Sequence, residues 1–117
     1  MSEKITYRIA HIGINTENSE EAYALAEVLC GLFCQEPERD APVSLFAGNI
    51  FEIMKHSRRG KNGHIALQTP DVEAAMADLA KKGITFQEDT IRRDENGHIR
   101  FVYLVQEIGG FAFHLTV

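Results

Sequence analysis

Three histidines and one glutamate lie in short segments of alternating apolar residues. His11, His64 and His114 occur in AHIGI, GHIAL and FAFHL, and Glu52 occurs in FEIM. Imidazole nitrogen and carboxylate oxygen together suit zinc, nickel, iron, manganese or cobalt, whereas calcium and magnesium prefer oxygen ligands alone. A lone histidine in a strand is more often a packing residue than a ligand. The four residues therefore predict a divalent transition-metal site only if the fold brings them together.

An internal repeat indicates that they do meet. The segments that begin at His11 and His64 match at an offset of 53 residues, so these two histidines are equivalent. The segments GNIFEIM and GFAFHLT form a second matching pair, which places Glu52 opposite His114. We therefore predict one domain, 1–117, built from a module of residues 1–56 and a module of residues 64–117 joined by the polar link 57–63.

Each copy begins with a strand followed by a helix, because the apolar period changes from two to about 3.6. Residues 7–15 alternate as a strand, and residues 18–33 form a helix in which Asn18 followed by Glu21 predicts an N-cap. In the second copy, we expect Thr69 to cap the helix and Pro70 to take its first position. Both helices carry an apolar stripe, formed by Ala22, Leu25, Ala26 and Leu29 and by Val72, Ala75, Met76 and Leu79.

The rest of each copy is predicted as strands and turns, so that the repeated unit is βαβββ. The first copy has a short strand near 34–38, then VSLFA and IFEIMK around a turn at Gly48 and Asn49. The second has ITFQEDTIRR and HIRFVYLVQ around a tight turn at Asn96 and Gly97, and then FAFHLTV.

Strand alternation assigns the faces of the sheet. We expect the helices to cover Ile12 and Ile14, Ile65 and Leu67, and Phe113 and Leu115. The three histidines then point to the opposite face, and Glu52 joins them through its equivalence with His114. A pseudo-twofold relation between the copies would bring three imidazoles and one carboxylate to one curved surface.

Composition excludes several other classes of function. Twelve basic and 17 acidic residues give a net charge of −5, which argues against a nucleic-acid partner. No apolar run approaches the ~20 residues that cross a bilayer, and no targeting segment is recognisable. We expect a soluble, cytoplasmic protein without a membrane partner. Cys30 and Cys34 are expected to pack as small apolar residues rather than to form a disulfide.

The segments HIGINT, FEIMK, GHIALQT and GGFAFHLTV, in this order and spacing, resemble the vicinal oxygen chelate superfamily. This superfamily includes glyoxalases, bleomycin resistance proteins, methylmalonyl-CoA epimerases and extradiol dioxygenases. HIGINTEN, FEIMK and EIGGFAFHL are more narrowly similar to the glyoxalase-like domains attached to 2-keto-3-deoxy-6-phosphogluconate aldolases. The resemblance implies an α+β fold in which two βαβββ modules form a curved mixed sheet with helices on its convex face.

The resemblance also implies a function. His11, Glu52, His64 and His114 would hold the metal, and the substrate would be a small α-oxo or α-hydroxy compound that chelates it through two adjacent oxygens. Glu52 and His114 would be the catalytic residues that move a proton, as in a glyoxalase-like isomerase or lyase. His114 departs from the glutamate that many members carry at this position, which puts glyoxalase I activity in doubt.

Further residues are candidates for substrate binding. Arg58, Arg59 and Lys61 in the link would hold an anionic group, and Tyr103 would contact the substrate. Strand parity does not decide whether Arg92, Arg93 or Arg100 enters the site, because edge strands often contain bulges.

Two other readings stay open. One is a non-catalytic module, either a resistance-type binding protein or an accessory to an aldolase, and the four metal-binding residues disfavour the resistance type. The other is a non-haem iron dioxygenase, for which two histidines and one carboxylate would supply a facial triad. We expect a homodimer, since family members often pair.

Overall fold

The computed structural model describes residues 4–117, which form eight strands and two helices. The first half of the chain contains β1 (Arg8–Asn15), α1 (Ser19–Phe33), β2 (Pro37–Glu38), β3 (Ser44–Ala47) and β4 (Phe51–Met54). The second half contains β5 (Gly63–Gln68), α2 (Val72–Lys81), β6 (Phe86–Arg93), β7 (Ile99–Leu104) and β8 (Phe111–Thr116).

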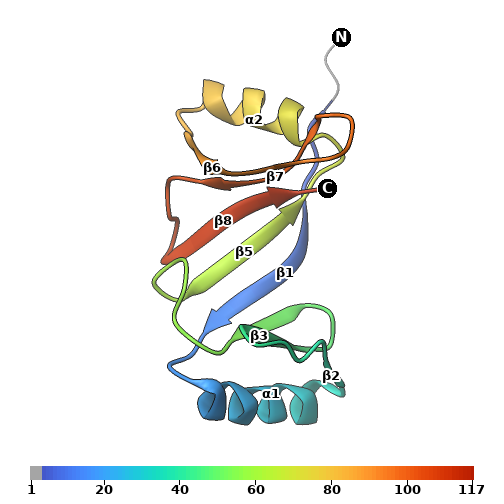
Figure 1. The fold of residues 1–117 in the computed structure, drawn as a ribbon, viewed down its shortest axis with the longest axis vertical. Helices are drawn as coiled ribbons and strands as arrows, with labels where there is room; N and C mark the ends of the chain where they lie inside the picture. Colours follow the sequence, from blue (N-terminus) through green and yellow to red (C-terminus); the bar gives the residue numbers. More distant parts are fainter. Residues whose placement is uncertain (1–3) are drawn as a thin grey trace.

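All eight strands belong to one mixed sheet in the order β2-β3-β4-β1-β5-β8-β7-β6 (Figure 1). The antiparallel pair β1 and β5 lies at its centre, and each of these strands has a parallel neighbour, β4 or β8. Figure 1 shows α1 and α2 at opposite ends of the sheet, in blue and yellow. The predicted glyoxalase-like α+β fold is confirmed.

The register of the central strands follows the internal repeat. On β1 and β4, Gly13 pairs with Glu52, and on β5 and β8, Ala66 pairs with His114. Since Gly13 and Ala66 are 53 residues apart, Glu52 and His114 occupy corresponding positions on their strands. The outer strands correspond in the same way, because Phe46 pairs with Glu52 and Tyr103 pairs with His114.

Both helices begin at a side-chain cap, and the cap of α2 differs from the predicted one. The Oδ1 of Asn18 accepts a hydrogen bond from the backbone N of Glu21 at 2.8 Å, as predicted. At α2 the cap is Asp71, whose Oδ1 accepts from the backbone N of Ala74 at 3.0 Å. The prediction of Thr69 as the cap was wrong, because Thr69 is buried and still pairs with β8 through its backbone N and the carbonyl oxygen of Thr116. Pro70 consequently precedes the helix.

Each helix covers a separate apolar core on one face of the sheet. The core beneath α1 includes Leu45 and Ile53, and the core beneath α2 includes Val102 and Leu115 together with the partly buried Leu67 and Phe113. Each fully buried side chain of this size contributes roughly 1.5–3 kcal/mol. These two cores hold β4, β5 and β8 in place. Glu52, His64 and His114 lie on the opposite face of these strands.

The two cysteines behave differently from each other. Cys30 packs against the core beneath α1, as predicted, and both thiols are free. The prediction for Cys34 was wrong, because it is exposed and ends α1 with a left-handed backbone, at φ 55°. The apolar run therefore stops contributing to the core one turn earlier than its composition indicates.

The link between the halves is tied to the sheet at the ends of two strands. The carbonyl oxygen of Asn62 accepts from the backbone N of Asn15 at 3.0 Å, and the backbone N of Asn62 donates to the carbonyl oxygen of Gly110 at 2.8 Å. The Nδ2 of Asn15 donates to the carbonyl oxygen of Gly60 at 3.0 Å. These bonds fix the link beside β1 and β8.

Within residues 4–117, no helix combines the length and apolar character needed to cross a membrane.

Candidate metal centre

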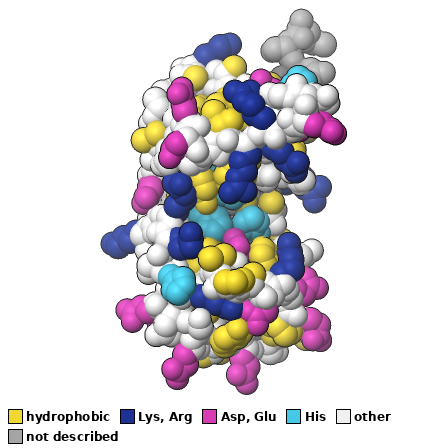
Figure 2. Space-filling view, in the orientation of Figure 1, with side chains coloured by type: hydrophobic (Ala, Val, Ile, Leu, Met, Phe, Trp, Pro, Cys, Tyr) yellow, Lys and Arg dark blue, Asp and Glu magenta, His cyan; other side chains and the backbone are white. Residues whose placement is uncertain are grey.

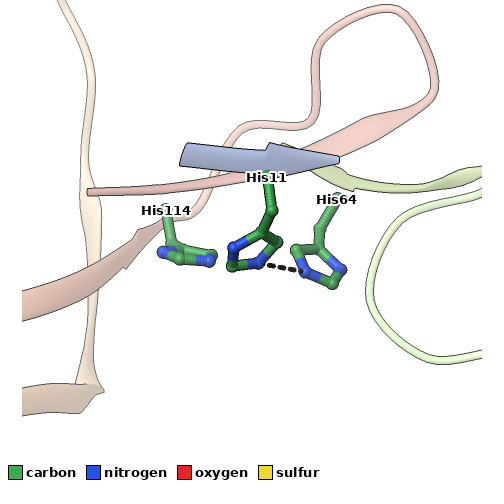
Figure 3. A group of neighbouring side chains, drawn as sticks. All are labelled: His11, His64 and His114. Atoms are coloured by element: carbon green, nitrogen blue, oxygen red, sulfur yellow. Dashed lines mark hydrogen bonds between the residues drawn. The ribbon is translucent and has the colours of Figure 1, made fainter. Parts of the chain in front are cut away.

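The four residues singled out in the sequence come from the four central strands of the sheet. His11 lies on β1, Glu52 on β4, His64 on β5 and His114 on β8. These strands are consecutive in the sheet, so their side chains on one face are neighbours. Figure 3 shows the imidazoles of the three histidines on one side of the ribbon, with His11 between His64 and His114.

Three of the four residues form a tight triangle. The Nε2 of His11 lies 3.2 Å from the Nε2 of His64, and the Oε1 of Glu52 lies 3.3 Å from the former and 3.0 Å from the latter. One nitrogen from each of the three histidines also lies within 4.8 Å of the others. Glu52 is not one of these three residues, and it joins the cluster through its contacts with His11 and His64.

His114 is the most enclosed member of the cluster. It is buried, and its ring lies 4.5 Å from that of Phe101 and 4.9 Å from that of Tyr103, measured between centroids. Burial, and then the neighbouring His64 and His11, lower its pKa to about 3, so the imidazole is neutral at pH 7. Within the part of the chain that the structure describes, its Nδ1 is buried and has no hydrogen-bond partner.

Glu52 is held in the opposite charge state. Burial raises its pKa, but hydrogen bonds from His11, His64 and Ser44 outweigh this effect and hold the pKa well below its usual range. The Ser44 hydroxyl donates to Oε2 at 2.7 Å, while Oε1 faces the two imidazoles. The carboxylate therefore presents one oxygen to the cluster and anchors the other.

These properties fit a bound divalent transition metal. Metal binding requires neutral imidazoles and an ionised carboxylate, which are the states found for His114 and Glu52. A buried Nδ1 without a partner is costly unless something occupies the space beside it. The three histidines, with one nitrogen each within 4.8 Å of the others, could hold such an ion together.

Two residues that shape the centre were missed as contributors. Gly13 pairs with His64, and a Cβ added to Gly13 would lie 2.1 Å from the His64 ring, so only glycine leaves room for this imidazole. A glycine inside an alternating strand is a usable signal of such a close approach. Ser44 gave no signal, because its bond to Glu52 depends on the pairing of β3 with β4.

A cleft of about 560 Å³ opens beside the cluster. His64, Arg58, Arg59 and Tyr103 line it, whereas Lys61 is not among the lining residues. Arg92 also lines it, because the register of β6 shifts on both sides of this residue and leaves it opposite Phe101. Figure 2 shows the histidines and a carboxylate in a hollow with Lys and Arg side chains around it.

Other basic residues and cavities lie elsewhere. Arg93 donates to the carbonyl oxygen of Gly97 in the β6–β7 turn. Arg100 lines a larger cavity, of about 760 Å³, at the start of α2 with Glu73 and His98. None of the cluster residues lines that cavity, whereas His64 lines the smaller cleft.

Comparisons with known proteins identify solved structures of the same fold. No family model matches the chain, and no curated protein matches it. A variant of methylmalonyl-CoA epimerase from Streptomyces coelicolor, in complex with 2-nitronate-propionyl-CoA, aligns with 24% identity and a TM-score of 0.59, covering 96% of both chains. The methylmalonyl-CoA epimerase of Mycobacterium tuberculosis aligns with 16% identity and a TM-score of 0.54, covering 92% of this chain and 85% of the other.

A hypothetical protein from Bacillus halodurans aligns with 16% identity and a TM-score of 0.61, covering 95% of this chain and 94% of the other. At these identities, the similarity concerns the fold. The chain therefore shares the glyoxalase-like α+β fold of these structures.

Proposed function

We propose that the protein is a metal-dependent isomerase or lyase of the glyoxalase type. Its substrate would be a small α-oxo or α-hydroxy acid that chelates the metal through two adjacent oxygens and exchanges a carbon-bound proton. The observation that carries this proposal is the cluster of His11, His64 and Glu52 at 3.0–3.3 Å, with a ring nitrogen of His114 within 4.8 Å of those of the other two histidines.

His11, Glu52, His64 and His114 would hold the metal. A bound divalent metal would supply a Lewis acid that stabilises negative charge on the substrate oxygens and acidifies the adjacent carbon. The chain's own residues prepare the site for this chemistry, because Gly13 leaves space for His64 and Ser44 fixes the orientation of Glu52.

Glu52 is our candidate for the proton-transferring base. It is ionised at pH 7, and Oε1, the oxygen that Ser44 does not bind, faces the cluster. His114 is the second candidate, because its neutral imidazole has a free Nδ1 within the described residues. Phe101 and Tyr103 cover His114 and exclude water from that side of the centre. Two of the structures that share this fold are methylmalonyl-CoA epimerases, which supports an isomerase at the level of the fold.

Solvent-hydrogen exchange tests this function directly. Metal-loaded protein would be incubated in D2O with lactate, glycerate, malate or pyruvate. Proton NMR would follow deuterium at the hydroxyl-bearing carbon of the three hydroxy acids and at the methyl carbon of pyruvate. We expect exchange in at least one of these acids that disappears when a chelator removes the metal. Exchange that persists unchanged without metal, or in a His11→Ala/His64→Ala variant, would contradict the proposal.

One observation favours a second candidate, a non-haem iron dioxygenase. The tight triangle consists of two histidines and one carboxylate, which is the ligand set of the iron facial triad, and His114 lies outside that triangle. Oxygen consumption by the ferrous protein in the presence of a catechol would support this reading. Proton exchange with zinc-loaded protein, which has no redox chemistry, would support the isomerase instead.

We also propose a homodimer, which multi-angle light scattering would test. The exposed Ile9 on β1, with 55% of its surface accessible, lies on the central strand and supports a contact there. An accessory role beside an aldolase is a further proposal, and it rests on the sequence resemblance alone.

A further inference from the structure

We propose that Arg58, Arg59 and Arg92 form an anion subsite, so that the substrate carries a second anionic group, a phosphate or a carboxylate, besides its chelating oxygens. This inference rests on the proposed function, because the metal centre defines where the chelating end of the substrate would lie. It adds the chemical class of the other end.

The three arginines gather at the cleft although the protein as a whole is acidic. Arg58 and Arg59 come from the link, Arg92 comes from β6, and all three line the cleft of about 560 Å³ that also contains His64. The net charge of the chain is −5, so an excess of basic residues does not explain their meeting. The register shift in β6 is needed to place Arg92 in the cleft, opposite Phe101.

None of these arginines is neutralised by the protein. In the part of the chain that the structure describes, no carboxylate oxygen lies within 4.0 Å of their guanidinium nitrogens, although Asp89 also lines the cleft. The nitrogen Nη1 of Arg59 donates to the Oε1 of Gln87 at 2.6 Å, which leaves its other donors available. Three positive charges without a partner form a site for an anion.

Two of the guanidinium groups are held over aromatic rings that also contact His114. The Cζ of Arg59 lies 4.3 Å from the centroid of Tyr103, and the Cζ of Arg92 lies 4.8 Å from that of Phe101. Both rings pack against His114. One aromatic ring therefore separates each of these positive charges from His114. A substrate of a few carbon atoms would span this separation.

Stacking also explains why these exposed arginines can act as a site. A guanidinium stacked on a ring keeps its edge donors free for a planar or tetrahedral anion. It also loses less conformational freedom on binding than an unsupported surface side chain does. Arg93, the next residue along β6, serves instead in the turn and provides a natural comparison.

The test uses three related α-hydroxy acids with zinc-loaded protein. Glycerate has only the chelating end, 3-phosphoglycerate adds a phosphate, and malate carries a second carboxylate. Dissociation constants would be measured by calorimetry for the wild type, for an Arg59→Gln/Arg92→Gln variant and for Arg93→Gln. Circular dichroism would verify that each variant is folded.

We expect 3-phosphoglycerate or malate to bind the wild type at least about tenfold more tightly than glycerate, as expected for charge-assisted hydrogen bonds. The acid with the larger advantage identifies the anion as phosphate or carboxylate. The double variant should reduce this advantage to less than about threefold, and Arg93→Gln should leave it unchanged. Equal binding of all three acids by the wild type, or an advantage that survives in the double variant, would overturn the subsite.

Failure of the proposed function gives a different result. If glycerate binds equally well with and without zinc, chelation at the histidine cluster is contradicted. The advantage of 3-phosphoglycerate or malate over glycerate, measured in the metal-free protein and in the double variant, then still decides whether the anion subsite exists.

Discussion

The two halves of the sheet hold corresponding side chains in opposite ways. In the half with β3 and β4, Glu52 is charged and Ser44 donates a hydrogen bond to it at 2.7 Å. In the half with β7 and β8, His114 is neutral and packs against Phe101. Strand register makes Ser44 and Phe101 equivalent, since they pair with Met54 and Thr116, each two residues beyond Glu52 or His114.

This difference shows how a repeated unit produces one asymmetric centre. The shared register places both side chains on the same face, whereas the residue types at each pair of positions determine charge and hydrogen bonding. One half would thus contribute an ionised oxygen ligand to the proposed metal centre and the other a neutral nitrogen ligand.

The largest effect is expected for Glu52→Gln. The amide keeps the shape of the side chain but cannot accept a proton from the substrate, so proton exchange should fall by roughly 10²–10⁴-fold. Metal content should largely survive, because three histidines remain. Both quantities would be measured, by NMR in D2O and by plasma mass spectrometry.

His114→Gln provides the comparison from the other half. We expect it to weaken zinc retention while preserving more of the proton exchange at saturating metal than Glu52→Gln does. Full exchange activity in Glu52→Gln would refute the role of Glu52 as the base. It would indicate that His114 moves the proton instead.

The second prediction compares Gly13 with Ala66, its equivalent in the other half. In Gly13→Val, the added side chain would displace the His64 imidazole, which a Cβ alone would approach to 2.1 Å. Metal affinity, measured by competition with a chromophoric chelator, should fall by about 10–100-fold, as for other changes that misorient a ligand. Ala66→Gly should alter metal affinity by less than about threefold. The sheet already accommodates a Cβ at position 66, so its removal displaces no neighbouring imidazole. Equal losses in both variants would contradict the asymmetry.

The third prediction concerns the stability of the metal-free protein at acidic pH. The folded state holds the pKa of His114 at about 3, below the ordinary 6.5, so between these values the unfolded chain binds a proton that the folded chain does not. Stability should therefore fall as pH drops below 6.5, by up to about 1.4 kcal/mol per pH unit from this residue.

Glu52 acts in a different pH range. Its pKa is lowered, so its stabilising contribution is complete above its ordinary value of 4.5 and decreases only as pH falls below that value. Urea denaturation should thus show that the free energy of unfolding of the wild type decreases between pH 7 and pH 5. This decrease should be smaller in His114→Gln, and in Glu52→Gln it should equal that of the wild type. If the free energy of unfolding depended on pH equally in the wild type and in His114→Gln, the loss of stability could not be assigned to His114.

The fourth prediction concerns the anchor of Glu52, and the change is Ser44→Ala. Removal of the hydroxyl that binds Oε2 of Glu52 should cost about 1.5–3 kcal/mol of the free energy of unfolding, as for other hydrogen bonds to charged groups. Ser57→Ala, an exposed serine in the link, should change it by less than about 0.5 kcal/mol. A Ser44→Ala protein with unchanged stability and metal affinity would mean that Glu52 needs no anchor.

Much of the fold could be predicted because local pattern and repeat agreed. The strands around His11, Glu52, His64 and His114 were found from alternation, and the match of GNIFEIM with GFAFHLT paired Glu52 with His114 as the strand register does. Their placement on one face follows from the period of two in a strand. The candidate cluster could thus be predicted from the sequence alone.

The remaining features depend on contacts between distant elements. Thr69 was misassigned because pairing with β8 overrides its capping preference, and Asp71 caps instead. Arg92 entered the cleft through a register shift that strand parity does not predict. Ser44 is an ordinary strand residue in the sequence, and only the pairing of β3 with β4 brings its hydroxyl to Glu52.

The metal content of purified, extensively dialysed protein shows whether His11, Glu52, His64 and His114 form a metal centre. Plasma mass spectrometry would compare the wild type with a His11→Ala/His64→Ala variant and with a control, His56→Ala/His98→Ala, which removes two exposed histidines outside the cluster. We predict about one transition metal per chain in the wild type and the control, and almost none in the cluster variant. A wild type that retains no metal after reloading, or a cluster variant that retains as much as the wild type, would contradict the account.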